Sequence, residues 1–199
     1  MSEIFKYNSD QVITINTNAG KSQIINYEIL PIFEDTLPLL SQVIPNFDFS
    51  KPSVNPIDLA GSLKSTLKQY KGIGLAANQC NIPVRCFVIE SNKKVIACFN
   101  PRVIELSSFS GKMNEGCLSF PGLYLSVERP LSIKVEYEDE YGVTMRGDFS
   151  GLTARCFLHE LDHLNGVKFT QRVGKTTLML AKKKQDKLIR NYKKQKRSA

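Results

Sequence analysis

Apolar residues recur at helical spacing in two interior stretches of the chain. In the first, Asn55 and Pro56 have the character of an N-cap and a first-turn proline, and the helix is expected to end near residues 71–72. Its apolar face comprises Leu59, Leu63, Leu67 and Tyr70. In the second stretch, Ser150 is a candidate N-cap and Gly166 a candidate left-handed terminator. Its apolar positions are Ala154, Leu158, Leu161 and Leu164, so a buried helix is predicted.

Shorter stretches alternate between apolar and polar residues, which is the pattern of half-buried strands. Residues 84–90 and 95–99 are predicted as two strands joined by a polar turn. Ile133, Val135 and Tyr137 alternate with charged residues, and a turn at Gly142 leads to another strand around residues 143–145. A short strand near residues 12–15, or an ordered extension there, and a short helix between prolines within residues 27–49 complete the pattern.

Length and cysteine usage restrict the class of protein. A chain of 199 residues fits a single domain with a sizeable core. Five cysteines are an odd number without the density of a disulfide scaffold, so reduced thiols in a reducing compartment are expected. No apolar run reaches the length of a membrane span, and the N-terminus does not resemble a secretory signal. We therefore expect a soluble, cytoplasmic protein, with an organellar location as the alternative.

Basic residues gather at the C-terminal end. Residues 172–199 contain eleven Lys or Arg and one acid, whereas the rest of the chain has sixteen basic and eighteen acidic residues. Within this segment Leu178, Ala181, Leu188 and Tyr192 form a narrow apolar stripe, so residues 176–192 are predicted as a surface helix. A separable basic segment indicates a polyanionic partner, and RNA is favoured over a membrane because large apolar anchors are few.

The only two histidines, His159 and His163, lie four residues apart in the second predicted helix. That spacing places both imidazoles on one helical face, where each can offer a nitrogen to a single metal ion. Glu160 follows the first histidine and is not needed as a ligand. A carboxylate beside a water that a metal has made acidic can accept its proton, which is the chemistry of a hydrolase. Two histidines do not fill a tetrahedral site, so a third ligand must come from elsewhere.

Two other stretches have unusual compositions. Residues 72–79, Gly-Ile-Gly-Leu-Ala-Ala-Asn-Gln, are small enough for a substrate or a neighbouring element to approach the backbone. They lack the further glycine and the lysine of a phosphate loop. Residues 115–119, Glu-Gly-Cys-Leu-Ser, place Cys117 just ahead of a Pro-Gly turn. From the sequence alone this cysteine is a reactive thiol, a metal ligand or a small buried residue.

In their order along the chain, these two stretches and His-Glu-Leu-Asp-His at 159–163 resemble the three signature motifs of the peptide deformylase family. The resemblance extends to a strand start at residues 128–130, the acidic turn near Gly142 and residues 164–169, and it covers roughly residues 27–173. One departure is Leu158, where many relatives carry glutamine. The family removes the N-formyl group from the formyl-methionine of nascent polypeptides and releases formate, so this activity is expected.

The resemblance also implies a fold and an organisation. The fold class is α+β, with antiparallel β-sheets packed around a central metal-binding helix and a basic C-terminal helix. Residues 1–173 would form one catalytic domain, in which residues 1–26 are an N-terminal extension of no assigned role. Residues 174–199 would form the basic tail. Some bacterial relatives dock on the ribosome through a C-terminal helix, so the segment from Lys182 to Arg197 is a candidate for contacts with ribosomal RNA. A solubilising, partly frayed helix is the alternative.

The site residues follow from the same resemblance. Cys117, His159 and His163 would bind one divalent metal, with Fe(II) expected and zinc, nickel or cobalt as alternatives. Glu160 would be the general base, and the Gln79 side-chain amide and the Leu118 backbone N–H would stabilise the oxyanion. The residues expected to bind the substrate backbone beside the methionine pocket are Ile73, Gly74, Glu115 and Gly116. Arg129 and Asp162 are a candidate supporting ion pair.

Two other functions fit part of the pattern. A zinc peptidase of another kind would need a third ligand after the helix, where no histidine remains. A basic RNA-binding protein with a structural metal would have a closed site of four protein ligands. Cys156 lies one turn before His159 and would supply the fourth ligand in that case.

Overall fold

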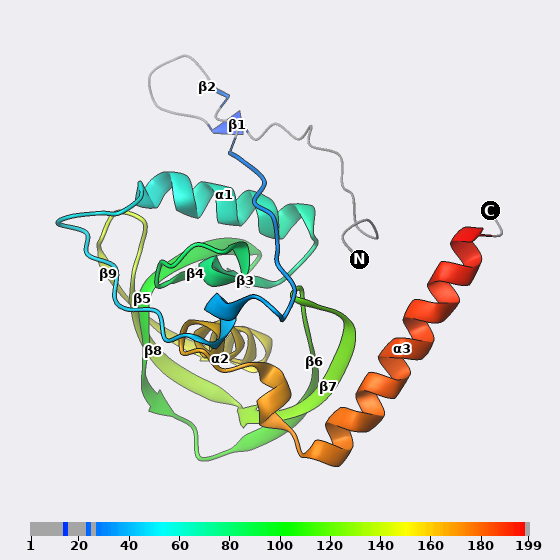
Figure 1. The fold of residues 1–199 in the computed structure, drawn as a ribbon. Coiled ribbons are helices and arrows are strands. Elements are labelled where there is room, and N and C mark those ends of the chain that lie inside the picture. Colours follow the sequence, from blue (N-terminus) through cyan, green and yellow to red (C-terminus); the bar gives the residue numbers. More distant parts are fainter. Residues whose placement is uncertain (1–13, 16–22, 25–26, 198–199) are drawn as a thin grey trace.

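The computed structural model describes residues 14–15, 23–24 and 27–197, and its folded part is an α+β assembly (Figure 1). A five-stranded antiparallel sheet has the order β3-β4-β5-β8-β9, and a separate antiparallel hairpin pairs β6 with β7. The sheet strands are Gly74–Ala76, Cys86–Ser91, Lys94–Leu106, Ser132–Glu138 and Thr144–Ser150, and the hairpin strands are Ser110–Cys117 and Phe120–Pro130. The helices are α1 (Pro56–Gln69), α2 (Gly151–Leu164) and α3 (Lys175–Arg197). The predicted fold class is confirmed.

Helix α1 covers one face of the sheet (Figure 1). Its N-terminus is capped as predicted, because the Asn55 side chain accepts hydrogen bonds from the N–H groups of Ile57 and Asp58 at 3.0 and 3.3 Å. The predicted apolar positions Leu59, Leu63 and Leu67 are buried against β3, β4 and β5. The helix ends at Gln69, slightly before the predicted boundary, and leads directly into the short strand β3.

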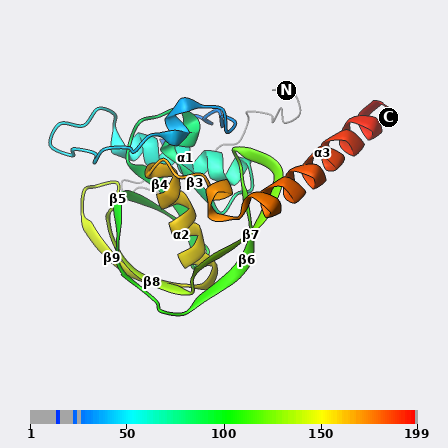
Figure 2. The ribbon, with the colours of Figure 1, turned by 60° about the horizontal axis from the view of Figure 1, so that its bottom comes forward.

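Helix α2 lies at the centre of the molecule, between the large sheet and the β6–β7 hairpin (Figures 1 and 2). Phe157 packs edge-on against Phe87 of β4, with ring centroids 5.0 Å apart. Ser150 occupies the predicted N-cap position, but its hydroxyl makes no capping hydrogen bond. Gly166 lies just past the last turn with φ +70°, as expected for a residue that ends a helix in the left-handed region. Helix α2 is therefore a buried, rigid support for the two histidines.

The strands differ from the prediction mainly around residues 107–130. The predicted hairpin of residues 84–99 is confirmed, although β5 continues to Leu106. Cys117 ends strand β6, and Pro121 and Gly122, which were expected to form a turn, belong to strand β7. Residues 128–130, expected as the start of a strand, are the end of β7. The predicted strand at 143–145 begins at Thr144 and runs to the start of α2.

Three short elements precede or follow these strands. The 3₁₀ helices are η1 (Pro38–Ser41), η2 (Ala77–Cys80) and η3 (Phe169–Arg172), and η1 is the predicted helix between prolines. Thr14–Ile15 (β1) pairs with Gln23–Ile24 (β2) and matches half of the strand expected at residues 12–15. Residues 12 and 13 lie outside the described residues. All five cysteines are free, as predicted.

Helix α3 extends the predicted surface helix to Arg197 and packs on the hairpin by its first half. Leu178 and Ala181 contact the buried cluster that Phe120, Leu123 and Phe169 help to form. Gln185 donates a hydrogen bond to the Pro121 carbonyl at 2.8 Å. The second half stands away from the body (Figures 1 and 2). In the described part of the chain, no helix combines the length and apolar character needed to cross a membrane.

Candidate metal centre

Three donor atoms converge where α2 meets the end of β6. Cys117, His159 and His163 each offer one ligand atom, and these atoms lie within 4.8 Å of one another. The Cys117 Sγ is 3.2 Å from the Nε2 of His163, and the two imidazole centroids are 5.2 Å apart. One thiolate and two imidazoles suit a divalent transition metal and leave a coordination position free for water or substrate. The residues present therefore fit a metal site, and the structure brings the three predicted ligands together.

A buried carboxylate orients the first histidine. The Nδ1 of His159 lies 3.0 Å from the Oε2 of Glu115, so its Nε2 is the nitrogen that faces the metal group. Burial would raise the pKa of Glu115, but hydrogen bonds from His159 and Arg129 outweigh it and lower that pKa to about 2. The pKa of His159 is also shifted: burial would lower it, yet hydrogen bonds with Cys117 and Glu115 raise it to about 10. A metal that binds His159 must consequently displace a proton.

Glu115 belongs to a larger network of buried ion pairs. Its carboxylate accepts hydrogen bonds from Arg129 at 2.6 and 2.9 Å and from Arg155 at 2.7 Å. Arg129 also contacts Asp162 at 2.9 Å, which confirms the predicted pair, and Arg172 binds the same carboxylate. The sequence did not reveal Arg155, Arg172 or the contact of Glu115 with His159. Glu115 lines the cavity described below, but its carboxylate is fully engaged, so a role in binding the substrate backbone stays a prediction.

The second histidine and the neighbouring glutamate are both deeply buried. Burial lowers the pKa of His163 well below its usual value, which keeps the imidazole in the neutral form that binds metals. Burial also raises the pKa of Glu160 to about 7, and its Oε2 has no hydrogen-bond partner among the described residues. A carboxylate with a pKa near neutrality and a free oxygen has the character of a general base.

Gly74 allows Glu160 to reach the site. A Cβ atom at position 74 would lie 2.5 Å from the Oε1 of Glu160 and 2.6 Å from the Sγ of Cys156, which is closer than real contacts allow. With any larger residue at position 74, the Glu160 carboxylate and the Cys156 thiol would have to move from these positions. This close approach is the physical reason for one of the small residues noted in the sequence.

The Gln79 side chain is oriented towards the metal group by the backbone N–H of Ala76. Its Oε1 accepts a hydrogen bond from the Ala76 N–H at 2.9 Å, which directs the Nε2 to Ser119 Oγ at 3.1 Å and Cys117 Sγ at 3.5 Å. The side-chain amide thus presents N–H donors beside the thiolate. Donors fixed in this way are suited to stabilising negative charge without reorganisation.

A cavity of about 930 Å³ opens onto these groups. Apart from the buried His163 and the supporting pair of Arg129 and Asp162, the predicted site residues line it: Ile73, Gly74, Gln79, Glu115, Gly116, Cys117, Leu118, His159 and Glu160. Leu152 and Tyr124 are exposed by 53% and 66% at its mouth and were not predicted. The volume is sufficient for a short peptide.

Cys156 does not complete a fourth ligand position. Its thiol donates to the Ile73 carbonyl at 3.2 Å, and burial raises its pKa well above the usual value. Among the described residues, the group of potential metal ligands contains Cys117 and the two histidines and does not include Cys156. The closed structural site therefore has no support from this cysteine.

An antiparallel α+β fold that holds a Cys-His-His group and a buried glutamate around a central helix is the arrangement of a metal-binding protein. The chain belongs to the polypeptide deformylase family, whose model matches residues 29–178. This family is metal-dependent, in agreement with the ligand group. The family assignment confirms the resemblance that the three motifs carry.

Relatives of known name support the same assignment. The peptide deformylase of Prochlorococcus marinus is 45% identical over 120 residues, which cover 58% of this chain and 59% of the relative. The chain thus matches about three fifths of the length of that relative. The peptide deformylase of Thermotoga maritima is 38% identical over 128 residues, which cover 64% of this chain and 78% of the relative.

Solved structures agree with the fold. The peptide deformylase structure from Legionella pneumophila superposes with a TM-score of 0.74 and 29% identity, covering 83% of this chain and 98% of that one. The structure from Synechococcus elongatus, in complex with actinonin, gives a TM-score of 0.73 and 33% identity over 79% of this chain and 88% of that one.

Proposed function

We propose that this protein hydrolyses the N-formyl group of formyl-methionine at the start of nascent polypeptides and releases formate. The observation that carries the proposal is the buried Glu160 beside the three-ligand group, with a free oxygen and a pKa raised to about 7 by burial. A structural metal site would have no use for a buried carboxylate with an unpartnered oxygen, because such a group is costly to keep.

Cys117, His159 and His163 would hold the metal, with Fe(II) expected and zinc, nickel or cobalt able to use the same ligands. When bound, a divalent ion supplies Lewis-acid activation of water and of the formyl carbonyl. A thiolate ligand also makes a ferrous site sensitive to oxidation, which calls for anaerobic preparation.

Side-chain and backbone groups of the protein would carry out the proton transfers and stabilise the negative charge that develops in the reaction. Glu160 accepts a proton from the attacking water, whose oxygen bonds to the formyl carbon. The Gln79 amide and the Leu118 backbone N–H donate hydrogen bonds to the oxygen on which negative charge develops. As the carbon–nitrogen bond breaks, Glu160 returns its proton to the leaving amine and formate departs. The peptide backbone would lie along Ile73, Gly74 and residues 115–116 at the cavity wall.

The experiment that tests the activity is an assay of formate release from formyl-Met-Ala-Ser. The full chain, loaded anaerobically with Fe(II), is compared with Glu160→Ala, and metal content is measured for both. We expect turnover by the parent and a loss of 10²-fold or more, on the order of a general-base contribution, in a variant that still binds metal. A parent that binds metal but releases no formate would overturn the proposal and favour a structural metal.

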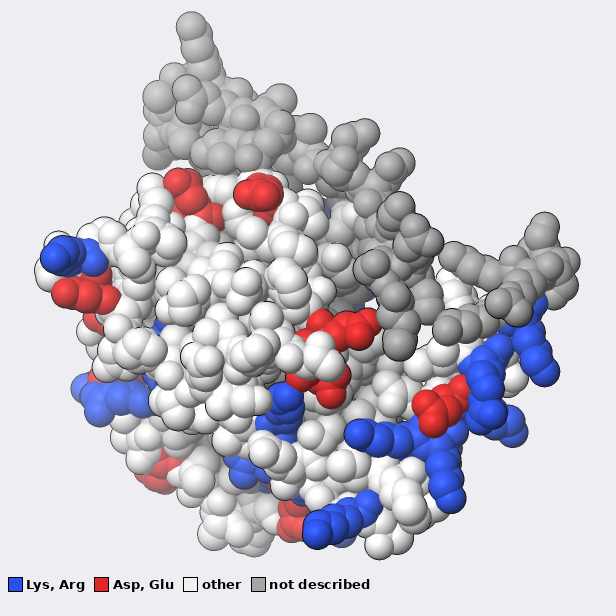
Figure 3. All heavy atoms as spheres, in the orientation of Figure 1, with Lys and Arg blue, Asp and Glu red and all other residues white. Residues whose placement is uncertain are grey.

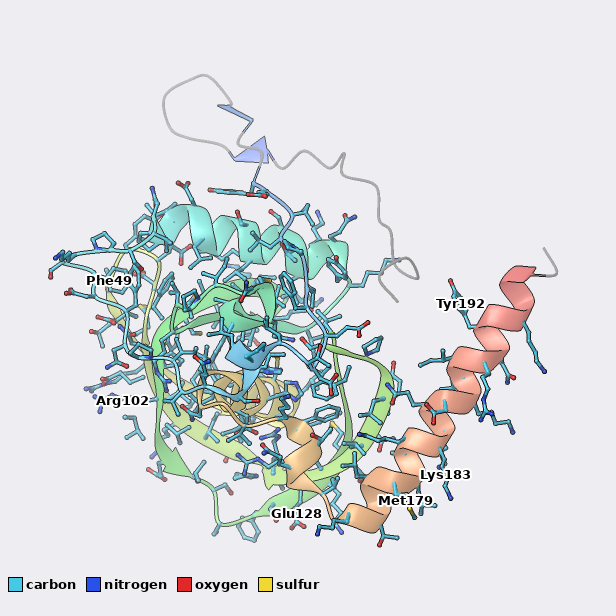
Figure 4. All side chains as sticks on the ribbon, in the orientation of Figure 1. Phe49, Arg102, Glu128, Met179, Lys183 and Tyr192 are labelled. Carbon is cyan, nitrogen blue, oxygen red and sulfur yellow. The ribbon has the colours of Figure 1, made fainter. Side chains whose placement is uncertain are left out.

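We further propose that residues 1–173 form the catalytic unit and that the basic tail contacts ribosomal RNA, which places the protein in the cytoplasm with nascent chains. Lys and Arg side chains gather along α3 in the space-filling view (Figure 3), and Met179 and Lys183 lie on the side turned away from the hairpin (Figure 4). The segment of residues 182–197 is rich in Lys and Arg, whose charges phosphates could neutralise.

Sedimentation with ribosomes tests this contact. The parent is expected to co-sediment at low salt and to lose binding steeply as salt rises, because phosphate contacts release counterions. Replacing Lys182, Lys183, Lys184 and Lys187 by glutamine should reduce binding and its salt dependence while formate release from the tripeptide continues. Equal binding by that variant would contradict the contact and favour a solubilising helix.

A further inference from the structure

Asn78 is a buried polar residue to which the proposed chemistry gives no role. It lies on η2, one residue before Gln79, and is fully buried. Its Nδ2 donates a hydrogen bond to the backbone carbonyl of His163 at 2.6 Å. Because the amide nitrogen occupies that contact, the orientation of the side chain is fixed and Oδ1 is left as an acceptor.

Two buried atoms in this contact lack partners. Among the described residues, Oδ1 of Asn78 and Nδ1 of His163 have no hydrogen-bond partner. They belong to two side chains whose residues are already joined by the bond above. Buried polar atoms without a hydrogen-bond partner are rare and cost free energy, so these two atoms need an explanation. The Oδ1 of Asn78 is an acceptor, and the Nδ1 of His163 carries a proton when the Nε2 of the same ring is to bind a metal.

The two ligand histidines therefore differ in how their second nitrogen is held. His159 is oriented by a carboxylate, through Nδ1 and Glu115 Oε2 at 3.0 Å. The Nε2 of His163 faces Cys117 Sγ at 3.2 Å, so its Nδ1 must also carry hydrogen if Nε2 is to present a lone pair. The unpartnered Asn78 oxygen is an acceptor on a residue already bonded to His163.

We propose that Asn78 is a positioning residue for His163: its Oδ1 accepts the Nδ1–H, directly after a small rotation of the ring or through one buried water, and keeps Nε2 free for the metal. This inference rests on the proposed metal site. Under this proposal the two histidines are oriented by different groups. An anionic carboxylate orients His159, and a neutral amide orients His163. The proposal also gives position 78, inside the Gly-Ile-Gly-Leu-Ala-Ala-Asn-Gln stretch, a function separate from the oxyanion donor Gln79.

The position of the proton can be measured because the chain has only two histidines. Side-chain nitrogen NMR of the metal-free, ¹⁵N-labelled full chain would show both imidazoles, and His159→Gln leaves only His163 and so assigns it. We expect His163 in a single neutral form with its proton on Nδ1. In Asn78→Leu this signal should become a mixture of tautomers, whereas the His159 signal should not change. Asn78→Asp retains an acceptor oxygen and should restore the single form.

Metal affinity provides the second measurement. Co²⁺ titration of the metal-free chain should give binding weaker by about tenfold or more in Asn78→Leu, the usual effect of losing a group that orients a ligand. Ser65→Ala is the matched control, because the Ser65 hydroxyl on α1 is likewise buried without a partner among the described residues. This control should leave Co²⁺ affinity unchanged.

A His163 proton on Nε2 in the parent would overturn the inference, and this result needs no variant to fold. An unchanged His163 tautomer and Co²⁺ affinity in folded Asn78→Leu would overturn it as well. Neither measurement uses turnover, so failure of the proposed deformylation would show independently, as a parent with the expected tautomer that releases no formate.

Discussion

Gly74 is the residue at which packing and chemistry are most tightly linked. We predict that Gly74→Ala lowers the rate of formate release by about 10²-fold, the usual effect of misplacing a reacting group by about 1 Å. The new methyl group would lie 2.5 Å from Glu160 Oε1 and 2.6 Å from Cys156 Sγ, so the carboxylate must move. Both atoms are side-chain ends that can shift, so the fold should survive, as thermal unfolding and metal content would report.

Gly174→Ala is the control for this substitution. A Cβ at Gly174 meets nothing within 4 Å, and the position lies in the connection before α3. It should leave both the rate and the melting temperature unchanged. If Gly74→Ala keeps the parental rate, Glu160 does not need its observed position.

Some residues of the site could be predicted from their spacing in the sequence, and others could not. Glu160 and the two histidines were predictable because helical periodicity fixes which positions share a face. The hydrogen bond between His159 and Glu115 was not predictable, because the two residues lie 44 apart in sequence and meet only through tertiary packing. Arg155 was within reach, because it lies four residues before His159 and so on the same helical face. A charged residue at a buried position of an amphipathic helix was the overlooked signal.

At the scale of elements, Arg129 connects the hairpin to the central helix. It lies on β7 and pairs with Glu115 of β6 and with Asp162 of α2, and its side chain is only 4% exposed. We predict that Arg129→Met lowers the free energy of unfolding by about 3 kcal/mol, because breaking a buried ion pair leaves charges uncompensated. This value is at the low end for breaking a buried ion pair, because Arg155 and Arg172 still contact the two carboxylates. Urea unfolding measures it.

Arg102→Met is the matched control for the ion-pair prediction. Arg102 pairs with Glu136 on the outer side of the sheet (Figure 4), and its side chain is 65% exposed. Exposed pairs contribute about 0–1 kcal/mol, so little stability should be lost. Equal effects of the two substitutions would mean that the buried network does not join the elements as described.

Helix α3 provides a comparison between a packed and an unpacked half. Leu178 contacts the buried cluster on the hairpin, whereas Leu188 is 55% exposed. We predict that Leu178→Ala speeds amide hydrogen exchange over the first turns of α3, because apolar packing there is what holds the helix to β7. Leu188→Ala should not change exchange in those turns. An identical exchange pattern in the two variants would contradict a hairpin-anchored helix.

The elements that the sequence predicted well are those with a regular apolar period and recognisable ends. Helix α1 has both, in its leucine face and its Asn55 cap. Strand β6 has neither: its residues are mostly exposed, and its buried member is the charged Glu115. No apolar alternation could reveal it. Strand β7 did carry a signal, because Leu123, Leu125 and Val127 alternate with exposed residues. The β6–β7 hairpin was not predicted, because β6 shows no alternation of apolar and polar residues.

At the scale of the whole molecule, the folded part is a neutral body with a basic helix attached at one edge. The charge distribution was predictable from the sequence, because it depends on composition alone. How the tail is attached was not, since that depends on Gln185 meeting a carbonyl of β7 and on apolar contacts across the hairpin. The same edge borders the cavity, because Pro121 both lines it and accepts the bond from Gln185.

The distribution of the five cysteines over the molecule makes metal binding measurable by thiol chemistry. Cys117 is half-buried and lines the cavity, whereas Cys80, Cys86, Cys98 and Cys156 are buried, although Cys156 also borders the cavity. Burial raises the pKa of Cys80 to about 12 and the pKa values of the other three well above their usual range. Since the thiolate is the reactive form, iodoacetamide should modify Cys117 alone in the folded, metal-free protein.

Metal should then protect that single thiol. With Zn²⁺ bound, the proposed ligand Cys117 would donate a lone pair to the metal, so we expect modification to slow greatly while the other four cysteines stay unmodified. Intact mass and peptide mapping before and after chelation would follow the change, and Cys117→Ser should take up no label in either state. Modification of Cys117 at the same rate with and without Zn²⁺ would remove it from the ligand set. Label on Cys156 instead would mean that this buried thiol is reactive from the cavity that it borders.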